Sequence, residues 1–263
     1  MENDTLSAAG IARYLRHREL RLKVYQSIDS TNTQLKAMAA EGAEAGLALI
    51  AESQTAGRGR MGRSFYSPAD SGLYLSLLLR PTLPAALAVR LTACAAVAAA
   101  ETIEEISGRE TAIKWVNDVY MDGRKVCGIL TEASVDTERG ALRYAVVGVG
   151  VNLRRPEGDF PDDLRGIAGA AFDGMETPDL RCRLAAGILD RLWDFSENPA
   201  DPAVFEAYRR RSLVLGREIN ILAPGRDPEP AVAVELEEDY SLRVRLPDGT
   251  TRRLSSGEVS VRV

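Results

Sequence analysis

The segment QTAGRGRMGRSF, residues 54–65, restricts the possible folds of this chain more than any other part of the sequence. From Gly57 it matches the dinucleotide fingerprint G-x-G-x-x-G, and it matches the P-loop pattern except that Arg63 replaces the lysine. Both patterns need an α-helix directly after the glycines, because the amides at its N-terminus hold the phosphate. Here Pro68 and Gly72 follow instead, and the next run, GLYLSLLLRP, alternates like a β-strand. The context is strand, loop, strand, so neither nucleotide-binding fold is expected.

The other apolar runs predict a mixed α+β domain followed by a small β module. The expected elements are a capped helix from Ser30 or Thr31 to Gly42, a strand at 46–54, an Ala-rich helix at 84–106, a hairpin around Asp122-Gly123, a strand at 143–153, and helices near 178–195 and 201–211. After Arg211, short alternating strands predict a small β-barrel. Strands joined by hairpins argue against a doubly wound sheet. We therefore expect a catalytic domain over 1–211 and a β module over 212–263.

Composition limits the partners of the chain. The net charge is −5, so the chain as a whole is not suited to coat a polyanion, and its basic chemistry must be local. The N-terminus has no apolar stretch typical of a signal peptide, and the longest apolar stretch, LTACAAVAAA, is too short to span a bilayer. We expect a cytoplasmic protein with no membrane partner.

The cysteines and the one histidine exclude several kinds of catalysis. Cys94, Cys127 and Cys182 are far apart and odd in number, which favours buried, reduced thiols. His17 is predicted to lie in an arginine-rich helix with its side chain in solvent. No Cys-x-x-Cys or His-Glu-x-x-His motif exists, so a structural zinc site is not expected. Nucleophilic catalysis assisted by histidine would have to use His17, which makes it improbable.

The arginines of the 54–65 segment have no acidic neighbour in sequence. Arg58, Arg60 and Arg63 lie in a stretch without acids from Gln54 to Ser67. Guanidinium groups suit carboxylate and phosphate oxygens, and the glycines let backbone amides approach a ligand. A solvated basic loop explains the same residues, as does an arm for nucleic acid, although one loop on an acidic protein is a weak indication of the latter.

A second polar group lies in KWVNDVYMDGRKVCGIL. Asn117 and Asp118 end an apolar strand, where turn chemistry alone is one explanation. Lys125 follows the hairpin turn, where it can neutralise an anion or simply extend into solvent. These residues become more informative beside the strand glycines described next.

Glycines interrupt two strand patterns nearby. Gly128, Gly148 and Gly150 lie inside apolar runs, which suggests close approach by a backbone or a ligand. Asn152 ends the last of these runs with a polar side chain. Glycine-lined strands with polar ends are typical of a small-molecule cleft.

Four motifs together resemble one family. STN (30–32), ESQTAGRGRMGRSF, KWVNDVYMDGRKVCGIL and VVGVGVNL occur in the order and spacing of biotin–protein ligases, over about residues 20–215 and on into the β module. The resemblance implies a catalytic domain related to class II aminoacyl-tRNA synthetases, with an SH3-like C-terminal domain. It also implies formation of biotinyl-5′-AMP from biotin and ATP with Mg²⁺, and transfer of biotin to a lysine of a biotin carboxyl carrier protein.

The resemblance assigns roles to individual residues. The expected biotin and adenylate contacts are Ser30, Thr31, Asn32, Gln54, Gly57, Gly59, Met61, Arg63, Phe65, Trp115, Asn117, Gly128, Gly148 and Asn152. The expected catalytic groups are Lys125, Arg60, Arg58 and Asp118, the last as a base or an orienting group. The 57–63 loop is expected to close over the ligand and to be disordered without it. Phe65 replaces a family tryptophan near adenine, Val116 replaces a proline, and no metal ligand can be assigned.

The resemblance also bears on partners. Longer members carry an N-terminal domain that binds operator DNA, but only about 20 residues precede the matching region here. We therefore expect no DNA partner and no repressor activity. The oligomeric state is expected to be either a monomer or a homodimer. The alternative enzyme is a lipoate–protein ligase of the same fold. A corepressor-type DNA-binding protein is disfavoured by the charge, and a biotin-binding module without catalysis would not need Lys125 together with the arginine loop.

Overall fold

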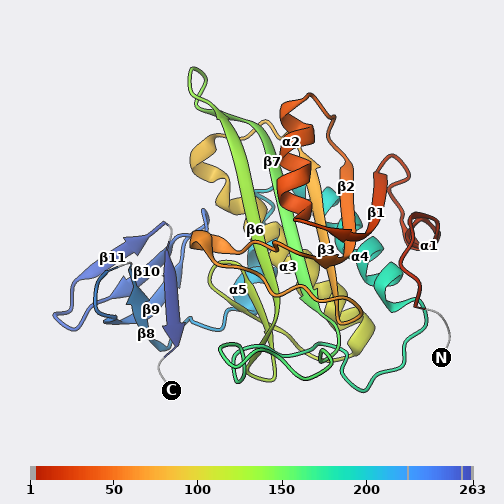
Figure 1. Cartoon of the computed structure of the whole chain (residues 1–263). Coiled ribbons are helices and arrows are strands. Elements are labelled where there is room, and N and C mark those ends of the chain that lie inside the picture. The colour runs from red at the N-terminus through yellow and green to blue at the C-terminus, as the bar shows by residue number, and fades with distance from the viewer. Residues whose placement is uncertain (1–3, 224, 256, 262–263) are drawn as a thin grey trace.

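The larger part of the protein is built on a seven-stranded sheet (Figure 1). The computed structural model describes residues 4–223, 225–255 and 257–261. The sheet order is β1-β2-β3-β7-β6-β5-β4. Its strands are β1 (Arg21–Ile28), β2 (Leu47–Gln54), β3 (Gly72–Leu79), β4 (Ala112–Lys114), β5 (Asp118–Met121), β6 (Arg124–Asp136) and β7 (Ala141–Asn152).

The sheet is mixed, as the sequence predicts. β1 and β2 pair in parallel, and the crossover between them is α2 (Thr31–Ala40), whose N-cap Ser30 accepts a hydrogen bond from the Thr33 amide. The remaining neighbours pair antiparallel, and the Asp122-Gly123 turn joins β5 to β6. The predicted exclusion of a doubly wound sheet is therefore confirmed.

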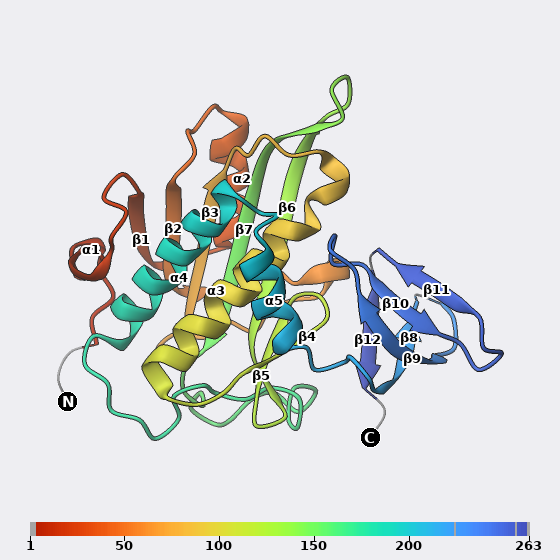
Figure 2. The ribbon, with the colours of Figure 1, turned by 180° about the vertical axis from the view of Figure 1, so that it is seen from behind.

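Helices cover both faces of the sheet (Figures 1 and 2). α3 (Val89–Ser107) and α4 (Leu180–Glu197) pack on one face, while α2 packs on the other. In β2, Ala48 and Ile50 join the core under α3 and α4, whereas Leu49 joins the smaller core under α2. Because both faces of β2 are buried, its sequence is a continuous apolar run rather than an alternating one.

The long Ala-rich helix is part of the core. Within the described residues, Ala85–Ser107 is the one helical stretch with the length and apolar character to cross a bilayer. However, 67% of its most apolar part is buried inside the protein. Buried core helices commonly have these properties, and the small alanine side chains of α3 let it lie close to α4 and the sheet.

A second, five-stranded antiparallel sheet follows α5 (Pro202–Arg210). Its order is β11-β10-β9-β8-β12, with β8 (Glu218–Leu222), β9 (Glu229–Leu236), β10 (Leu242–Arg245), β11 (Thr251–Leu254) and β12 (Glu258–Val261). Tyr240 attaches it to the rest of the protein: its carbonyl accepts a 2.8 Å hydrogen bond from Trp115 Nε1, and its ring meets Phe205 and Tyr208 edge-on. The two sheets are thus held together by an aromatic contact and a buried hydrogen bond.

The N-terminal region differs from the prediction. α1 ends at Tyr14, so His17 lies beyond the helix, and the predicted helical position is wrong. The predicted solvated side chain is also wrong, because Nδ1 lies 2.9 Å from Glu19 Oε1 and Nε2 lies 2.7 Å from Asp194 Oδ1. Sequence patterns near His17 did not reveal Asp194, since it belongs to α4, 177 residues away. The three cysteines are buried and unpaired, as predicted.

Candidate active site

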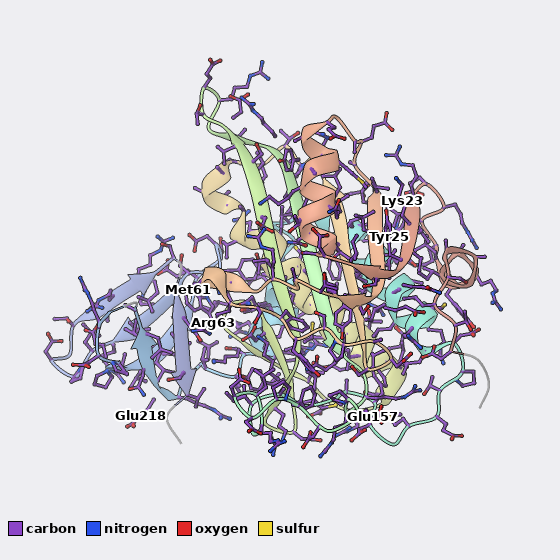
Figure 3. The ribbon with its side chains drawn as sticks, viewed as in Figure 1. Lys23, Tyr25, Met61, Arg63, Glu157 and Glu218 are labelled. Atoms are coloured by element: carbon purple, nitrogen blue, oxygen red, sulfur yellow. The ribbon has the colours of Figure 1, made fainter. Side chains whose placement is uncertain are left out.

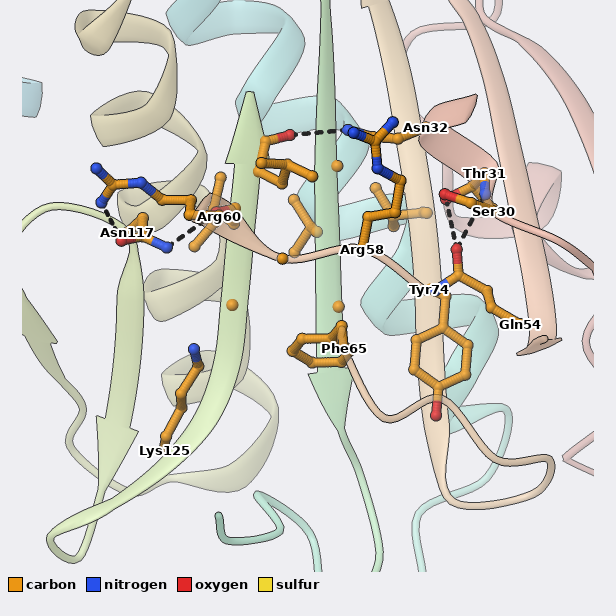
Figure 4. A pocket seen from close by; sticks show the side chains of 18 residues that line it. Ser30, Thr31, Asn32, Gln54, Arg58, Arg60, Phe65, Tyr74, Asn117 and Lys125 are labelled. Carbon is orange, nitrogen blue, oxygen red and sulfur yellow. Dashed lines mark hydrogen bonds between the residues drawn. The ribbon is translucent and has the colours of Figure 1, made fainter. Parts of the chain in front are cut away.

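A pocket opens on the α2 face of the large sheet, between the start of α2, the 54–65 segment and the middle strands (Figure 4). Twelve of the eighteen predicted site residues line it: Ser30, Thr31, Asn32, Gln54, Arg58, Gly59, Arg60, Phe65, Asn117, Lys125, Gly128 and Gly148. Four segments that are distant in sequence therefore meet at one place, as the resemblance implies.

Three other predicted residues lie on or beside the loop. Gly57 is buried, and its carbonyl accepts a hydrogen bond from the Phe65 amide, which closes the base of the loop. Met61, 55% exposed, and Arg63 lie at the outer end of the loop, beside the second sheet (Figure 3). In this arrangement neither Met61 nor Arg63 lines the pocket.

The remaining three lie behind the pocket. Trp115 is buried under the second sheet and does not line the pocket, so its position does not support substrate binding. Asp118 contacts Lys125 from outside the lining, and Asn152 donates a hydrogen bond to the Gly169 carbonyl, 3.1 Å away. These positions suit support of the site rather than direct contact with a ligand.

Glycines in β6 and β7 make room for side chains that cross the sheet. A Cβ on Gly148 would overlap Asn32, with Cγ only 2.9 Å away. A Cβ on Gly150 would lie 2.6 Å from the Phe65 ring, and one on Gly128 2.9 Å from it. The sequence prediction of close approach at these glycines is confirmed, and the approaching groups are Asn32 and Phe65.

A chain of hydrogen bonds forms the inner wall. Ser76 Oγ lies 2.7 Å from Thr31 Oγ1 and 2.6 Å from Asn32 Oδ1. Gln54 Oε1 accepts from the Thr31 amide at 2.9 Å, and Gln54 Nε2 donates to Ser67 Oγ at 3.0 Å. Fixed polar groups in a partly apolar pocket supply orientation and specificity for a small ligand.

Each loop arginine has a partner far away in sequence. Arg58 Nη1 lies 3.3 Å from Glu132 Oε1. Arg60 donates to Asn117 Oδ1 at 2.7 Å and to the Gly257 carbonyl at 3.0 Å. Folding therefore supplies the counter-charges and acceptors that the loop itself lacks.

Arg63 ties the loop to the second sheet. It donates to both oxygens of Glu258 at 2.9 and 2.6 Å, a bidentate geometry. Burial raises the pKa of the Glu258 carboxyl. The hydrogen bonds and charge of Arg63 lower it by more, so the pKa lies below its usual value. Glu258 is therefore ionised at neutral pH and attracts the loop.

Lys125 completes the cationic side of the pocket. Its Nζ lies 2.7 Å from Asp118 Oδ1, and a Cβ on Gly128 would lie 3.3 Å from Nζ. The Lys125 backbone is held on the other side, because its amide donates to the Ile167 carbonyl and its carbonyl accepts from the Gly169 amide. Together with Arg58 and Arg60, Lys125 provides three cations around one pocket, which is suited to an anionic ligand.

Several pocket residues were not predicted. The additional lining residues are Tyr74, Leu75, Ile129, Leu130, Val149 and Gly150. Gly150 had a visible signal as a glycine inside a strand. Ser76 also had one, because it is a polar residue in the middle of the apolar run of β3, where it is fully buried. The apolar lining residues cannot be distinguished from core residues by pattern alone.

The described residues contain no group of three or more histidine, cysteine, aspartate or glutamate side chains placed to hold a metal ion. Near the pocket, Asp118 and Glu132 are already paired with cationic side chains. The donor set therefore does not fit a metal site made by protein side chains alone.

Comparison with known protein families identifies the class of protein to which this chain belongs. Residues 24–152 match the biotin/lipoate A/B protein ligase family. The bifunctional ligase/repressor of Bacillus spizizenii is 41% identical over 146 residues, which cover 55% of this chain and 44% of that protein. The chain thus spans less than half the length of this relative.

Two shorter relatives match over most of their length. The biotin–[acetyl-CoA-carboxylase] ligase of Mycobacterium tuberculosis is 33% identical over 90% of this chain and 88% of that protein. The biotin protein ligase of Aquifex aeolicus, solved in complex with biotin and ATP, is 28% identical with a TM-score of 0.72, over 92% of this chain and 98% of that chain. This chain belongs to the biotin–protein ligase family, and its predicted fold, an α+β domain with a small C-terminal β domain, is confirmed.

Proposed function

We propose that this protein is an ATP-dependent biotin–protein ligase, acting on the lysine of a biotin carboxyl carrier protein. The observation that carries the proposal is the convergence of Arg58, Arg60 and Lys125 on a pocket whose inner wall is polar and whose mouth is crossed by the 54–65 segment. The relatives named as biotin ligases, and the Aquifex aeolicus structure with biotin and ATP, support the same reaction.

In the first step, a carboxylate oxygen of biotin attacks the α-phosphorus of ATP, and the bond to pyrophosphate breaks. The products are biotinyl-5′-AMP and pyrophosphate. Two anions must approach each other, so fixed positive charge lowers the barrier. We assign this charge to Lys125, Arg58 and Arg60, and the loop over the pocket excludes water from the mixed anhydride.

In the second step, the neutral amine of the carrier lysine attacks the anhydride carbonyl. The bond to AMP breaks, an amide forms, and the amine loses a proton. Asp118 lies 2.7 Å from Lys125, which supports an orienting role toward Lys125 more directly than a role as the base.

Biotin fits the inner wall better than lipoate. Its ureido ring carries two N–H donors and a carbonyl acceptor, whereas the dithiolane ring of lipoate has no strong hydrogen-bonding group. The wall offers the hydroxyls of Ser30 and Thr31 and the amides of Asn32 and Gln54. A ligand unable to pair with these groups would leave buried polar atoms unsatisfied.

The remaining assignments follow from this reaction. ATP is the co-substrate, and Mg²⁺ would be held mainly by its phosphates, since the described part of the chain has no cluster of side chains placed to hold a metal ion. Three buried, unpaired cysteines support a cytoplasmic location. We retain the catalytic domain at 1–211 and the C-terminal domain at 212–263, without DNA or membrane partners and as a monomer or homodimer.

One assay tests the reaction itself. Purified protein is incubated with ATP and labelled pyrophosphate, with and without biotin, and incorporation of label into ATP is measured. We expect exchange that depends on biotin. Exchange with lipoate but not with biotin would contradict the proposal and favour the lipoate ligase.

A further inference from the structure

Glu132 on β6 is a partly buried acid beside the pocket that the proposed reaction leaves without a role. Its side chain is 15% exposed. Oε2 accepts from Asn32 Nδ2 at 3.1 Å, and Oε1 lies 2.6 Å from Lys36 Nζ and 3.3 Å from Arg58 Nη1. The carboxylate thus contacts a residue of the inner wall and a residue of the loop.

Glu132 fixes the orientation of the Asn32 amide. An ionised carboxylate only accepts hydrogen bonds, and so does a carbonyl. The Asn32 amide faces two such groups, Glu132 Oε2 and the Leu130 carbonyl, each 3.1 Å away. Both hydrogens of Nδ2 are therefore used here, and Oδ1 must face Ser76 and the space over Gly148.

That orientation sets the direction of the hydrogen-bond chain. Because Asn32 Oδ1 can only accept, Ser76 must donate its one hydroxyl hydrogen to it. The 2.7 Å contact between Ser76 and Thr31 then requires the Thr31 hydroxyl to donate to Ser76 rather than to Gln54 Oε1, which is farther away at 3.2 Å and already accepts from the Thr31 amide. Thr31 Oγ1 is left to present lone pairs, which accept an N–H from a ligand.

Glu132 stays charged because several neighbours, and not Lys36 alone, stabilise its carboxylate. Burial raises the pKa of Glu132, but the hydrogen bonds from Lys36 and Asn32 and the charge of Arg58 outweigh it, so the pKa lies below the usual value. Glu132 is therefore an acceptor at neutral pH, and a protonated carboxyl, which could donate to Asn32, is disfavoured.

We propose that Glu132 is a positioning residue of the ligase: it holds the Asn32 amide in one orientation and thereby sets the wall to accept the N–H groups of the biotin ureido ring. The inference rests on the proposed function. Glu132 acts on biotin through Asn32 and Thr31, so its main effect falls on biotin binding, while its contact with Arg58 gives a smaller effect on the chemical step.

The test is the Glu132→Gln variant, which keeps the size of the side chain but adds a donor. We expect the KM for biotin in pyrophosphate exchange to rise about tenfold, because a reversed or unpaired amide leaves a buried group unsatisfied. The kcat at saturating biotin should change less than the KM, because Arg58 keeps its charge although it loses a charged partner, and the midpoint of thermal unfolding should remain close to wild type. Lys36→Met is the matched control: it removes a partner of Glu132 but leaves the Asn32 contact, and its biotin KM should stay within about threefold of wild type.

A double variant tests whether the effect passes through Asn32. If it does, Glu132→Gln added to Asn32→Ala raises the biotin KM no further than Asn32→Ala alone. Additive effects would overturn the inference. So would a folded Glu132→Gln protein with an unchanged biotin KM, or a Lys36→Met variant with the same rise.

Two remaining results are also decisive. If Glu132→Gln does not fold, Glu132→Asp answers the same question, because the shorter carboxylate keeps its charge but moves away from Asn32; an unchanged biotin KM there would overturn the inference. If the wild-type protein shows no biotin-dependent exchange at all, the proposed function fails and the inference falls with it.

Discussion

Lys125 Nζ and Asp118 Oδ1 are 2.7 Å apart across the β5–β6 hairpin. Asn117 strengthens the arrangement, because its Nδ2 donates to the same aspartate oxygen at 3.0 Å and to the Ile129 carbonyl at 3.0 Å. The lysine is thereby held beside the pocket by a short turn rather than by a flexible loop. Precise placement of a cation is what charge stabilisation in a transition state requires.

The first prediction concerns this ion pair. Lys125→Ala should lower the rate of biotin-dependent exchange by roughly 10²–10³, as removal of one fixed charge-stabilising group does in other enzymes. Asp118→Asn leaves the lysine charged but less well oriented, so its loss should be smaller. Both variants are compared by exchange kinetics, with thermal unfolding as a check on folding. A greater loss for Asp118→Asn than for Lys125→Ala would show that Asp118 acts directly on a substrate.

The second prediction concerns the glycine under Asn32. Gly148→Ala places a methyl group against the Asn32 amide, which is held by Ser76 and Glu132 and cannot move freely. We expect destabilisation of about 1–3 kcal/mol, typical of overpacking, and loss of biotin binding. Chemical denaturation and titration with biotin measure the two effects.

Gly150→Ala is the matched control for Gly148→Ala. It meets the edge of the Phe65 ring instead, so its effect on biotin binding should be relieved by Phe65→Leu. Relief of the Gly148→Ala defect by Phe65→Leu would contradict the separate packing of the two glycines.

The third prediction is that Trp115 contributes to stability and not to substrate binding. Trp115→Phe removes the donor to the Tyr240 carbonyl while keeping an aromatic ring, and should cost about 1–3 kcal/mol of unfolding free energy. The KM for biotin should stay unchanged, because the indole lies under the second sheet. A stable variant with a raised biotin KM would restore the sequence prediction that Trp115 binds substrate.

The fourth prediction concerns the attachment of the loop to the second sheet. Glu258→Gln should raise the KM for ATP about fivefold, equivalent to roughly 1 kcal/mol, since Arg63 is largely exposed and its ion pair is screened. The effect should shrink at high salt. Glu229, which makes a similar bidentate pair with Arg252 on the same sheet, provides the control: Glu229→Gln should leave the KM for ATP unchanged.

The fifth prediction concerns pH. Both ring nitrogens of His17 face carboxylates, which only the doubly protonated imidazolium satisfies. Burial lowers the pKa of His17, but the hydrogen bonds that the ring donates to Asp194 and Glu19 and the charge of Asp194 raise it more, so the folded pKa lies above 6.5. The neighbouring Arg16 is itself paired with Asp194, and the buried Asp190 binds the His17 amide.

A raised folded pKa gives stability that is present below the unfolded pKa of about 6.5 and is lost as pH rises through the folded value. The difference in unfolding free energy between wild type and His17→Gln should therefore shrink from pH 5.5 to pH 8.5. NMR titration of this single histidine measures its pKa directly. A pKa below that of a free histidine would contradict the prediction.

Much of the architecture could be predicted because it depends on local pattern. Apolar periodicity and turn residues predicted the positions of most strands along the chain, the Asp122-Gly123 hairpin and the helices, and glycines inside strands marked where Asn32 and Phe65 approach the sheet. β1 was not predicted, because it is an edge strand that lacks a regular apolar run.

The sequence by itself determined most of the helices and strands, the family and most of the residues that line the pocket, because these depend on local spacing and motifs. Only the tertiary structure decided what those residues are paired with. Arg63 and Glu258 are 195 positions apart, and Asn32 and Glu132 are 100 apart. Such pairs depend on how the strands align and how the second sheet docks, and a long-range hydrogen bond leaves no periodic trace in the sequence.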